Sequence, residues 1–272
     1  MGMFSNDLKK LYNDTTARVM QVPSLAERTS KLERDNTIEV YEWHIIPPRT
    51  SEDKAGEIEV TDETTIQAVE RLRKEYGNDK RICMLNFASA KEPGGMWAEG
   101  SKAQEESLCY SSNLYWSLRK SLPLYQLNRS NLRRGLYTNN MVYSKDVTVF
   151  RDKDYNLLDE KDWYYVDCIS SAAPNRIATV KNGVDESAVQ NAMKDRIIRI
   201  LQLARTFGDE ILVLGAFGCG VFRNNPSVVV ELFKQVLLEN HGRYDFEKVV
   251  FAVPAGRDRE NYTVFNNLLG SN

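Results

Sequence analysis

A pair of neighbouring acids follows a pair of neighbouring glycines in the stretch PGGMWAEGSKAQEESLCYSS. Gly94 and Gly95 come first, and Gln104, Glu105 and Glu106 begin nine residues after the second glycine. Glycine adopts backbone conformations that expose peptide N–H groups to an anion, and paired carboxyl groups can donate and accept protons. The stretch therefore predicts acid–base chemistry on a bound anionic ligand. The alternative is that both acids only complement the dipole of a helix N-terminus.

A second glycine-rich stretch, GAFGCGVFRNN, contains Gly215, Gly218 and Gly220 and follows an apolar segment. Exposed N–H groups in such a loop favour a phosphate as the ligand. Glycine also ends strands for purely structural reasons. From spacing alone, a phosphate-binding role and a structural role therefore remain equally open.

The two acids are expected in the first turns of a helix. Ser101 and Gln104 have the spacing of a capping box, in which two side chains satisfy the backbone at the start of a helix. Adjacent helical residues point about 100° apart, so Glu105 and Glu106 are expected to perform different tasks. A Gln104 side chain that reaches back to Ser101 would be unavailable to a ligand, and the sequence leaves this conflict open.

Alternating helices and apolar strands must position these loops. A break at 45–60, where Pro47, Pro48, Ser51 and Gly56 interrupt the pattern, predicts a connecting loop. Periodic apolar residues predict helices over 4–20, 24–35, 64–76, 187–205 and 257–269, with a further helix from Pro226 that Asn225 caps. Strands are predicted over 37–46, 81–89, 139–151, 162–172, 210–217 and 248–254. This alternation predicts an α/β sheet with ligands at the carboxyl ends of the strands.

The composition excludes several classes of protein. The 272 residues are 42% hydrophobic and carry a formal net charge of -2, which predicts a globular protein without a broad basic surface for nucleic acid, although residues 129–135 form a local basic segment. The four cysteines and two histidines are scattered, so we expect neither a metal site nor a cofactor. No apolar run suits a secretory signal or a membrane span. We therefore expect an intracellular protein, cytoplasmic or nuclear, without a membrane partner.

The chain resembles the microbial-type poly(ADP-ribose) glycohydrolase family. The family signature is three glycines, a spacer, and a glutamine with two glutamates, and here it reads GGM followed by QEE. The blocks LNFASAKEPGG, QEESLCYSSNLY, SSAAPN and GAFGCGVFRNNP are also similar to that family and come in the expected order. The resemblance covers about residues 80–230 strongly. It implies a macrodomain-like mixed β-sheet flanked by helices, with an ADP-ribose-binding catalytic domain over 61–272 and an N-terminal helical extension and linker over 1–60.

The resemblance also implies roles for individual residues. Glu106 would be the catalytic carboxylate, and Glu105 its partner on the ribose next to the bond that breaks. Phe222 would pack on the distal ribose, and the loop before it would wrap the pyrophosphate with its N–H groups. The other implied ligand-binding residues are Asn86, Ala88, Gly94, Gly95, Met96, Gln104, Gly218, Cys219, Gly220 and Val221. On sequence alone, Phe222 is as well explained as a core aromatic residue, Asn86 as a partner of loop backbone, and Cys219 as inert.

One residue departs from the family signature. Met96 occupies the position of the third glycine, where its side chain is expected either to crowd the substrate or to point into the core. The expected activity is exo-acting cleavage of the O-glycosidic ribose bond of poly(ADP-ribose), by a monomer, with release of ADP-ribose. Two alternatives remain: a hydrolase of single ADP-ribose units on nucleic-acid bases or protein side chains, and a module that binds ADP-ribose without cleaving it. The expected partner is ADP-ribose or an ADP-ribosylated macromolecule, including nucleic acid in the first alternative.

Overall fold

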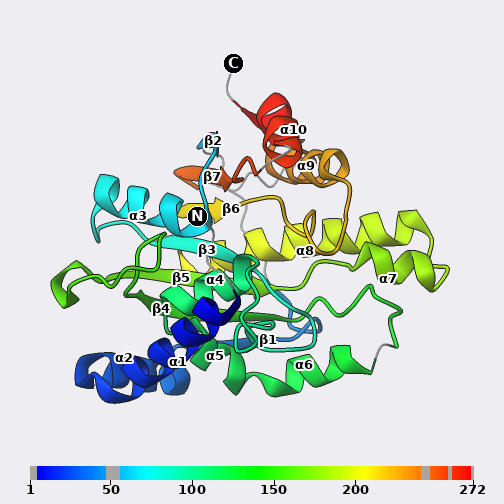
Figure 1. Cartoon of the computed structure of the whole chain (residues 1–272). Coiled ribbons are helices and arrows are strands. Elements are labelled where there is room, and N and C mark those ends of the chain that lie inside the picture. The colour runs from blue at the N-terminus through cyan, green and yellow to red at the C-terminus, as the bar shows by residue number, and fades with distance from the viewer. Residues whose placement is uncertain (1–4, 47–55, 131, 240–245, 257–258, 271–272) are drawn as a thin grey trace.

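The computed structural model describes residues 5–46, 56–130, 132–239, 246–256 and 259–270. Helices cover both faces of one seven-stranded sheet (Figure 1). The strands are β1 (Thr37–Val40), β2 (Glu57–Thr61), β3 (Ile82–Phe87), β4 (Met141–Val149), β5 (Tyr164–Ser171), β6 (Ile211–Leu214) and β7 (Lys248–Ala252). The α-helices are α1 (Ser5–Gln21), α2 (Pro23–Asp35), α3 (Thr65–Tyr76), α4 (Gln104–Ser111), α5 (Leu114–Lys120), α6 (Leu122–Arg129), α7 (Arg176–Lys181), α8 (Glu186–Phe207), α9 (Pro226–Lys234) and α10 (Glu260–Leu269).

The sheet is mixed. Its strand order is β1-β4-β5-β3-β6-β7-β2. Strand β4 runs antiparallel to β1 and β5, and the other neighbouring pairs are parallel. The predicted α/β class with a mixed, helix-flanked sheet is therefore confirmed. The carboxyl ends of β3, β5 and β6 meet at one edge of the sheet, and both glycine-rich loops leave the sheet there.

Alternating side chains of the strands fill two cores. On β3, Ile82 and Met84 pack into the core beneath α1 to α6, whereas Cys83 and Leu85 face the core beneath α8, α9 and α10. This alternation is the period of two that a strand buried on both faces requires. The helix that carries the two acids and the helix that follows the second glycine loop therefore lie on opposite faces of the sheet.

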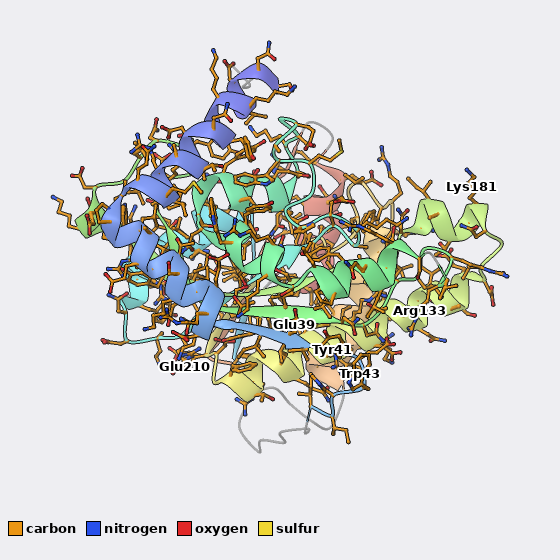
Figure 2. The ribbon with its side chains drawn as sticks, turned by 90° about the horizontal axis from the view of Figure 1, so that it is seen from below. Glu39, Tyr41, Trp43, Arg133, Lys181 and Glu210 are labelled. Carbon is orange, nitrogen blue, oxygen red and sulfur yellow. The ribbon has the colours of Figure 1, made fainter. Side chains whose placement is uncertain are left out.

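The predicted cap of α9 is confirmed, because the Asn225 side chain accepts the Ser227 N–H at 3.0 Å. Helix α8 ends at Phe207, close to the predicted end at residue 205, and Gly208 after it has a left-handed φ of 78°. The strand predicted over 37–46 is too long, because β1 ends at Val40. Beyond it the chain leaves the ladder, and the rings of Tyr41 and Trp43 stack on the surface (Figure 2), with centroids 4.4 Å apart.

The predicted connecting loop over 45–60 is partly wrong. Its last residues form β2, which pairs with β7 at the far edge of the sheet. Pro47, Pro48 and Ser51 lie outside the described residues. Pairing with a strand almost two hundred residues away leaves no local signal in the sequence, which is why the pattern alone predicts a loop here.

The N-terminal helices pack on the sheet as part of its core. Leu8 of α1 and Leu25 and Leu32 of α2 are fully buried in the same cluster as Met84. Strand β1 and most of β2, which form the two edges of the sheet, also come from the first sixty residues. A domain boundary at residue 60 stays a prediction, and these contacts give the two sides of that boundary a shared core. No helix in the described ranges is long and apolar enough to cross a membrane.

We expect the N-terminal helices and the sheet to unfold together. Leu25→Ala removes a side chain of a residue that is 1% exposed, which should lower the free energy of unfolding by about 3 kcal/mol. Circular dichroism during thermal unfolding should show one transition, shifted to lower temperature. Leu127→Ala, at a residue that is 46% exposed, should leave the midpoint almost unchanged. A separate early transition confined to part of the helical signal would contradict a shared core.

Candidate active site

Helix α4 begins at Gln104, and Glu106 closes its first turn. Ala103 is extended (φ -111°, ψ -170°), and its N–H donates to Oε2 of Glu106 at 2.8 Å. The predicted capping box between Ser101 and Gln104 is therefore wrong. A glutamate three residues after the N-cap performs the backbone contact that a glutamine was expected to make, and the true N-cap is an alanine, which carries no side-chain signal.

The second oxygen of Glu106 holds the glycine loop. Its Oε1 accepts the N–H of Met96 at 3.0 Å. Gly95, at φ 62°, lies directly against this carboxylate, since a Cβ built there would be 2.3 Å from Oε1 of Glu106 and 3.3 Å from Oε2 of Glu105. Glycine is therefore required at residue 95 both for its left-handed backbone and for the space that the two carboxyl groups occupy.

Glu105 points to a different set of partners. Its Oε2 accepts the Ser89 N–H at 2.6 Å, and its Oε1 accepts Nδ2 of Asn86 at 3.3 Å. Burial raises the pKa of Glu105 to about 8, and the charge of Glu106 acts in the same direction, whereas the contacts from Ser89 and Asn86 act against it. The expectation of different tasks agrees with this geometry: one acid closes the loop, and the other is a buried carboxyl group that is protonated at neutral pH.

The neighbouring site residues fix α4 against the sheet. The Gln104 side chain accepts the Phe87 N–H at 2.8 Å and donates to the Leu85 carbonyl at 2.8 Å and to Oγ1 of Thr65 at 3.1 Å. Gln104 thus joins α4 to β3 and α3, and its predicted place in ligand binding stays a prediction. Asn86 and Ala88 are also buried. Asn86 Nδ2 donates both to Glu105 and to Oγ of Ser170, the latter at 3.0 Å, and so joins Glu105 to strand β5.

Helix α1 supports the loop from the other side. The rings of Tyr12 and Trp97 meet edge to face with centroids 4.7 Å apart, and Trp97 follows directly after the residue whose N–H holds Glu106. The α1 residue Thr15 donates its hydroxyl to the Tyr110 carbonyl of α4 at 3.1 Å. One N-terminal helix therefore contacts both the glycine loop and the helix that carries the acids.

The loop after β6 offers a row of free backbone donors. The N–H groups of Gly220, Val221 and Phe222 donate to no acceptor in the described part of the chain. Gly218 is left-handed, with φ 74°. Consecutive unpaired N–H groups in a turn form a concave site for an anion. The loop geometry therefore suits the pyrophosphate that the family resemblance implies there. Cys219 in the same loop is buried, and that burial raises its pKa to about 12.

Phe222 and Met96 differ in their surroundings. Phe222 is partly buried, and its ring lies 6.1 Å from that of Tyr137 by centroid. Met96 is 57% exposed, so the expectation that it points into the core is wrong. Its φ is not left-handed, so glycine is not required at residue 96 for backbone reasons.

The basic segment over 129–135 is partly neutralised by acids. Arg129 forms an ion pair with Glu92 at 2.8 Å, and Arg133 pairs with Glu42. Residue 131 lies outside the described residues. Within the described ranges, no group of three or more histidine, cysteine, aspartate or glutamate side chains could hold a metal ion.

The pKa of Glu105 predicts a dependence of stability on pH. Between pH 4.5, its ordinary pKa, and about 8, the folded chain keeps a proton on Glu105 that the unfolded chain loses, so the free energy of unfolding falls as pH rises through this range. Glu105→Gln removes this effect. The difference in free energy of unfolding, variant minus parent, should therefore increase by about 3 kcal/mol from pH 5.5 to pH 8.5. Urea titration at the two pH values measures this difference.

The exposed Glu99 provides the control for this titration. Glu99→Gln should show the same difference from the parent at both pH values, because its side chain is in water in both states. A Glu105→Gln difference that does not change with pH would contradict a buried, protonated Glu105.

The comparisons with known proteins agree with this geometry. The family model for the microbial-type PARG catalytic domain matches residues 10–152. The chain is similar to the poly(ADP-ribose) glycohydrolase (PARG) from Thermomonospora curvata, at 33% sequence identity over 96% of this chain and 99% of that chain, with a TM-score of 0.88. The same enzyme bound to the inhibitor ADP-HPD gives 32% identity over the same shares, with a TM-score of 0.84.

A second bacterial enzyme gives a comparable match. The PARG from Deinococcus radiodurans in complex with ADP-ribose is 34% identical over 89% of this chain and 96% of that chain, with a TM-score of 0.79. A comparison with curated proteins gave no match. The family model covers more than half of the chain, and the structural matches extend over nearly all of it. The chain therefore belongs to the microbial-type poly(ADP-ribose) glycohydrolase family and has its macrodomain-like fold.

Proposed function

We propose that this chain cleaves the O-glycosidic ribose bond of poly(ADP-ribose) at chain ends and releases ADP-ribose. The observation that carries the proposal is the position of Glu106, whose carboxylate is fixed by the N–H groups of Met96 and Ala103 at the glycine loop. The free N–H groups of residues 220–222, in the loop after a neighbouring strand, support a place for the pyrophosphate of the same substrate.

The two carboxyl groups suit the chemistry of glycoside cleavage. The bond between the anomeric carbon and the leaving oxygen breaks through an oxocarbenium-like state, which needs an acid to protonate that oxygen and a base to activate water. In the proposed mechanism, Glu106 gives its proton to the leaving oxygen and then takes one from the water that adds to the anomeric carbon.

Glu105 has a supporting part in the proposal. Because its pKa is raised to about 8 by burial, Glu105 carries a proton at neutral pH and adds no negative charge beside Glu106. A protonated carboxyl group can also donate a hydrogen bond to a hydroxyl of the ribose next to the bond that breaks. The position from which Glu105 would donate depends on the contacts with Ser89 and Asn86, which hold the carboxyl group in place while burial keeps its pKa high.

Removal of the Glu106 carboxyl group should abolish turnover. Glu106→Ala should lower the rate of ADP-ribose release from poly(ADP-ribose) by at least about 100-fold, the usual contribution of a general acid–base group. Calorimetry should show that ADP-ribose still binds. Glu99→Ala, in the same loop but exposed, should release ADP-ribose at the parental rate. Binding of ADP-ribose by a parent protein that releases none from the polymer would instead support a binding module.

A methyl group at residue 95 should displace the catalytic carboxylate. In Gly95→Ala the new Cβ would lie 2.3 Å from Oε1 of Glu106, so kcat should fall by about 100-fold. Gly183→Ala is the matched control, because Gly183 has a similar φ of 64° and no atom within 4 Å of the added Cβ. Both variants share the backbone strain of a left-handed alanine. Equal kcat values in the two variants would contradict the proposed role of the loop.

The exposed side chain of Met96 is compatible with a second class of substrate. This side chain, beside the N–H that holds Glu106, favours contact with the group that leaves. We therefore retain single ADP-ribose units on protein side chains or nucleic-acid bases as a second substrate class. The ion pairs of Arg129 and Arg133 reduce the positive charge available for nucleic acid and favour the polymer as the first choice. Mass analysis of the products from each substrate separates the two.

A further inference from the structure

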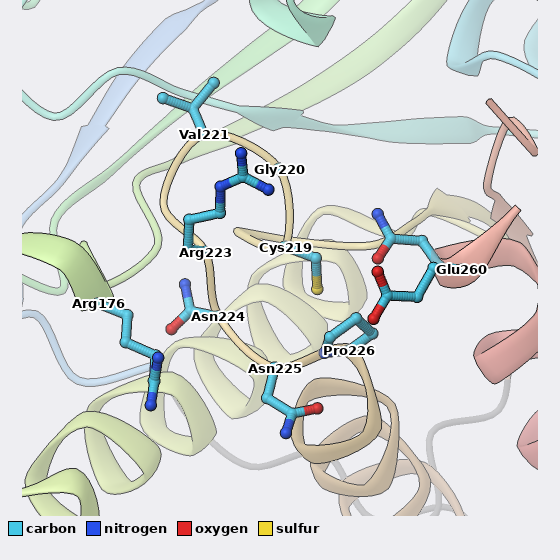
Figure 3. Close-up of a pocket in the computed structure, with 10 residues that line it drawn as sticks. Arg176, Cys219, Gly220, Val221, Arg223, Asn224, Asn225, Pro226 and Glu260 are labelled. Atoms are coloured by element: carbon cyan, nitrogen blue, oxygen red, sulfur yellow. The ribbon is translucent and has the colours of Figure 1, made fainter. Parts of the chain in front are cut away.

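A cavity of about 660 Å³ lies between the loop that follows β6 and the N-terminal ends of α7, α9 and α10 (Figure 3). Its charged lining residues are Arg176, Arg223 and Glu260. Cys219, Gly220 and Val221 of the loop also line it. The cavity therefore shares backbone with the row of free N–H groups at residues 220–222.

Arg223 has an unusual backbone conformation. Its φ is 58°, in the left-handed region that residues other than glycine rarely adopt, and its own N–H donates to the Gly220 carbonyl at 3.1 Å to close the turn. Figure 3 shows the Arg223 side chain among the residues that line the cavity. Strained backbone persists only where the surrounding structure imposes it, and such residues gather at ligand sites.

The guanidinium group of Arg223 has no partner within the part of the chain that the structure describes. Its side chain makes no hydrogen bond and no ion pair with any residue in the described ranges. Arg176, the other arginine of the cavity, pairs with Glu186 at 3.2 Å. A planar guanidinium group binds phosphate oxygens through two parallel hydrogen bonds and carries a full positive charge, which peptide N–H groups do not.

We propose that Arg223 binds the pyrophosphate of the ADP-ribosyl substrate together with the N–H groups of Gly220, Val221 and Phe222. This inference rests on the proposed function and deepens it, since it names a side chain that recognises the charge of the substrate. The backbone donors set the position of the pyrophosphate, and Arg223 supplies the cation that neutralises it. The role differs from those of Glu105 and Glu106, which face the ribose.

Calorimetry with four ligands tests the proposal. ADP-ribose and ADP carry the pyrophosphate, AMP carries one phosphate and adenosine carries none. Arg223→Gln should weaken the binding of ADP-ribose and ADP by about 10-fold to 100-fold, the usual range for a charged hydrogen bond, and should change adenosine binding less than twofold. Arg223→Lys should restore part of the lost affinity because it keeps the charge. The affinity of the parent for ADP-ribose should also fall more steeply with salt than that of Arg223→Gln.

Arg134→Gln is the matched control. Arg134 is also an exposed arginine with a left-handed φ of 51°, but it does not line the cavity. Its substitution should leave all four affinities unchanged, and circular dichroism should show that each variant is folded. Undiminished binding of ADP-ribose by Arg223→Gln would overturn the proposal, and so would an equal loss of affinity for adenosine and ADP.

Failure of the proposed function has a different signature. It would appear as a parent protein that releases no ADP-ribose from the polymer, whatever the affinities of the arginine variants. A loss of affinity for ADP in Arg223→Gln, without a comparable loss for adenosine, would then still support the pyrophosphate contact.

Discussion

Two hydrogen bonds to one carboxylate organise the site. Glu106 accepts the N–H of Ala103 with one oxygen and the N–H of Met96 with the other. The first contact starts α4 and the second closes the glycine loop, so the residue proposed to act on the substrate is also the residue that holds the two segments together. The orientation of this carboxylate therefore depends on the backbone of the loop, and Gly95 is required because any side chain there would occupy the same space.

The rest of the fold keeps that loop in place. Trp97 is packed against Tyr12 of α1 and against Tyr110 of α4, with ring centroids 4.7 Å and 5.9 Å apart. Gln104 anchors the start of α4 to β3. The N-terminal helix therefore contributes to the precision of the site although none of its residues is expected to touch the substrate. Such precision determines how much a positioned acid can accelerate a reaction.

The sequence predicts the α/β class, most helix positions and the proximity of the two glycine-rich loops, because these depend on local periodicity and on the rule that parallel strands end at one edge. It does not predict the partners of Glu106. Ser101 and Gln104 carry the side chains of a capping box, whereas the contact is made by the backbone of Ala103, which leaves no signal in the residue types. The strand β2 is missed for a similar reason, since only pairing with distant β7 makes it a strand.

The sequence also leaves open whether the second glycine loop, GAFGCGVFRNN, binds phosphate or only ends a strand. The glycines indicate a turn, but whether its N–H groups are free depends on hydrogen bonds that only the folded chain defines. Arg223 is part of the stretch GAFGCGVFRNN, but the residue types in that stretch do not predict its left-handed backbone or the absence of a side-chain partner among the described residues. The available signal is a single basic residue within a polar loop, which is too common to indicate a ligand.

The most direct test of the central claim is a crystal structure of the parent protein with ADP-ribose bound. The proposed arrangement predicts that Glu106 keeps its contacts with Met96 and Ala103, and that one of its oxygens lies about 2.6–3.2 Å from the hydroxyl on the anomeric carbon of the distal ribose. It also predicts the pyrophosphate on the N–H groups of residues 220–222. A distal ribose bound away from Glu106, with the glycine loop still closed by that carboxylate, would contradict the assignment of Glu106 as the catalytic acid.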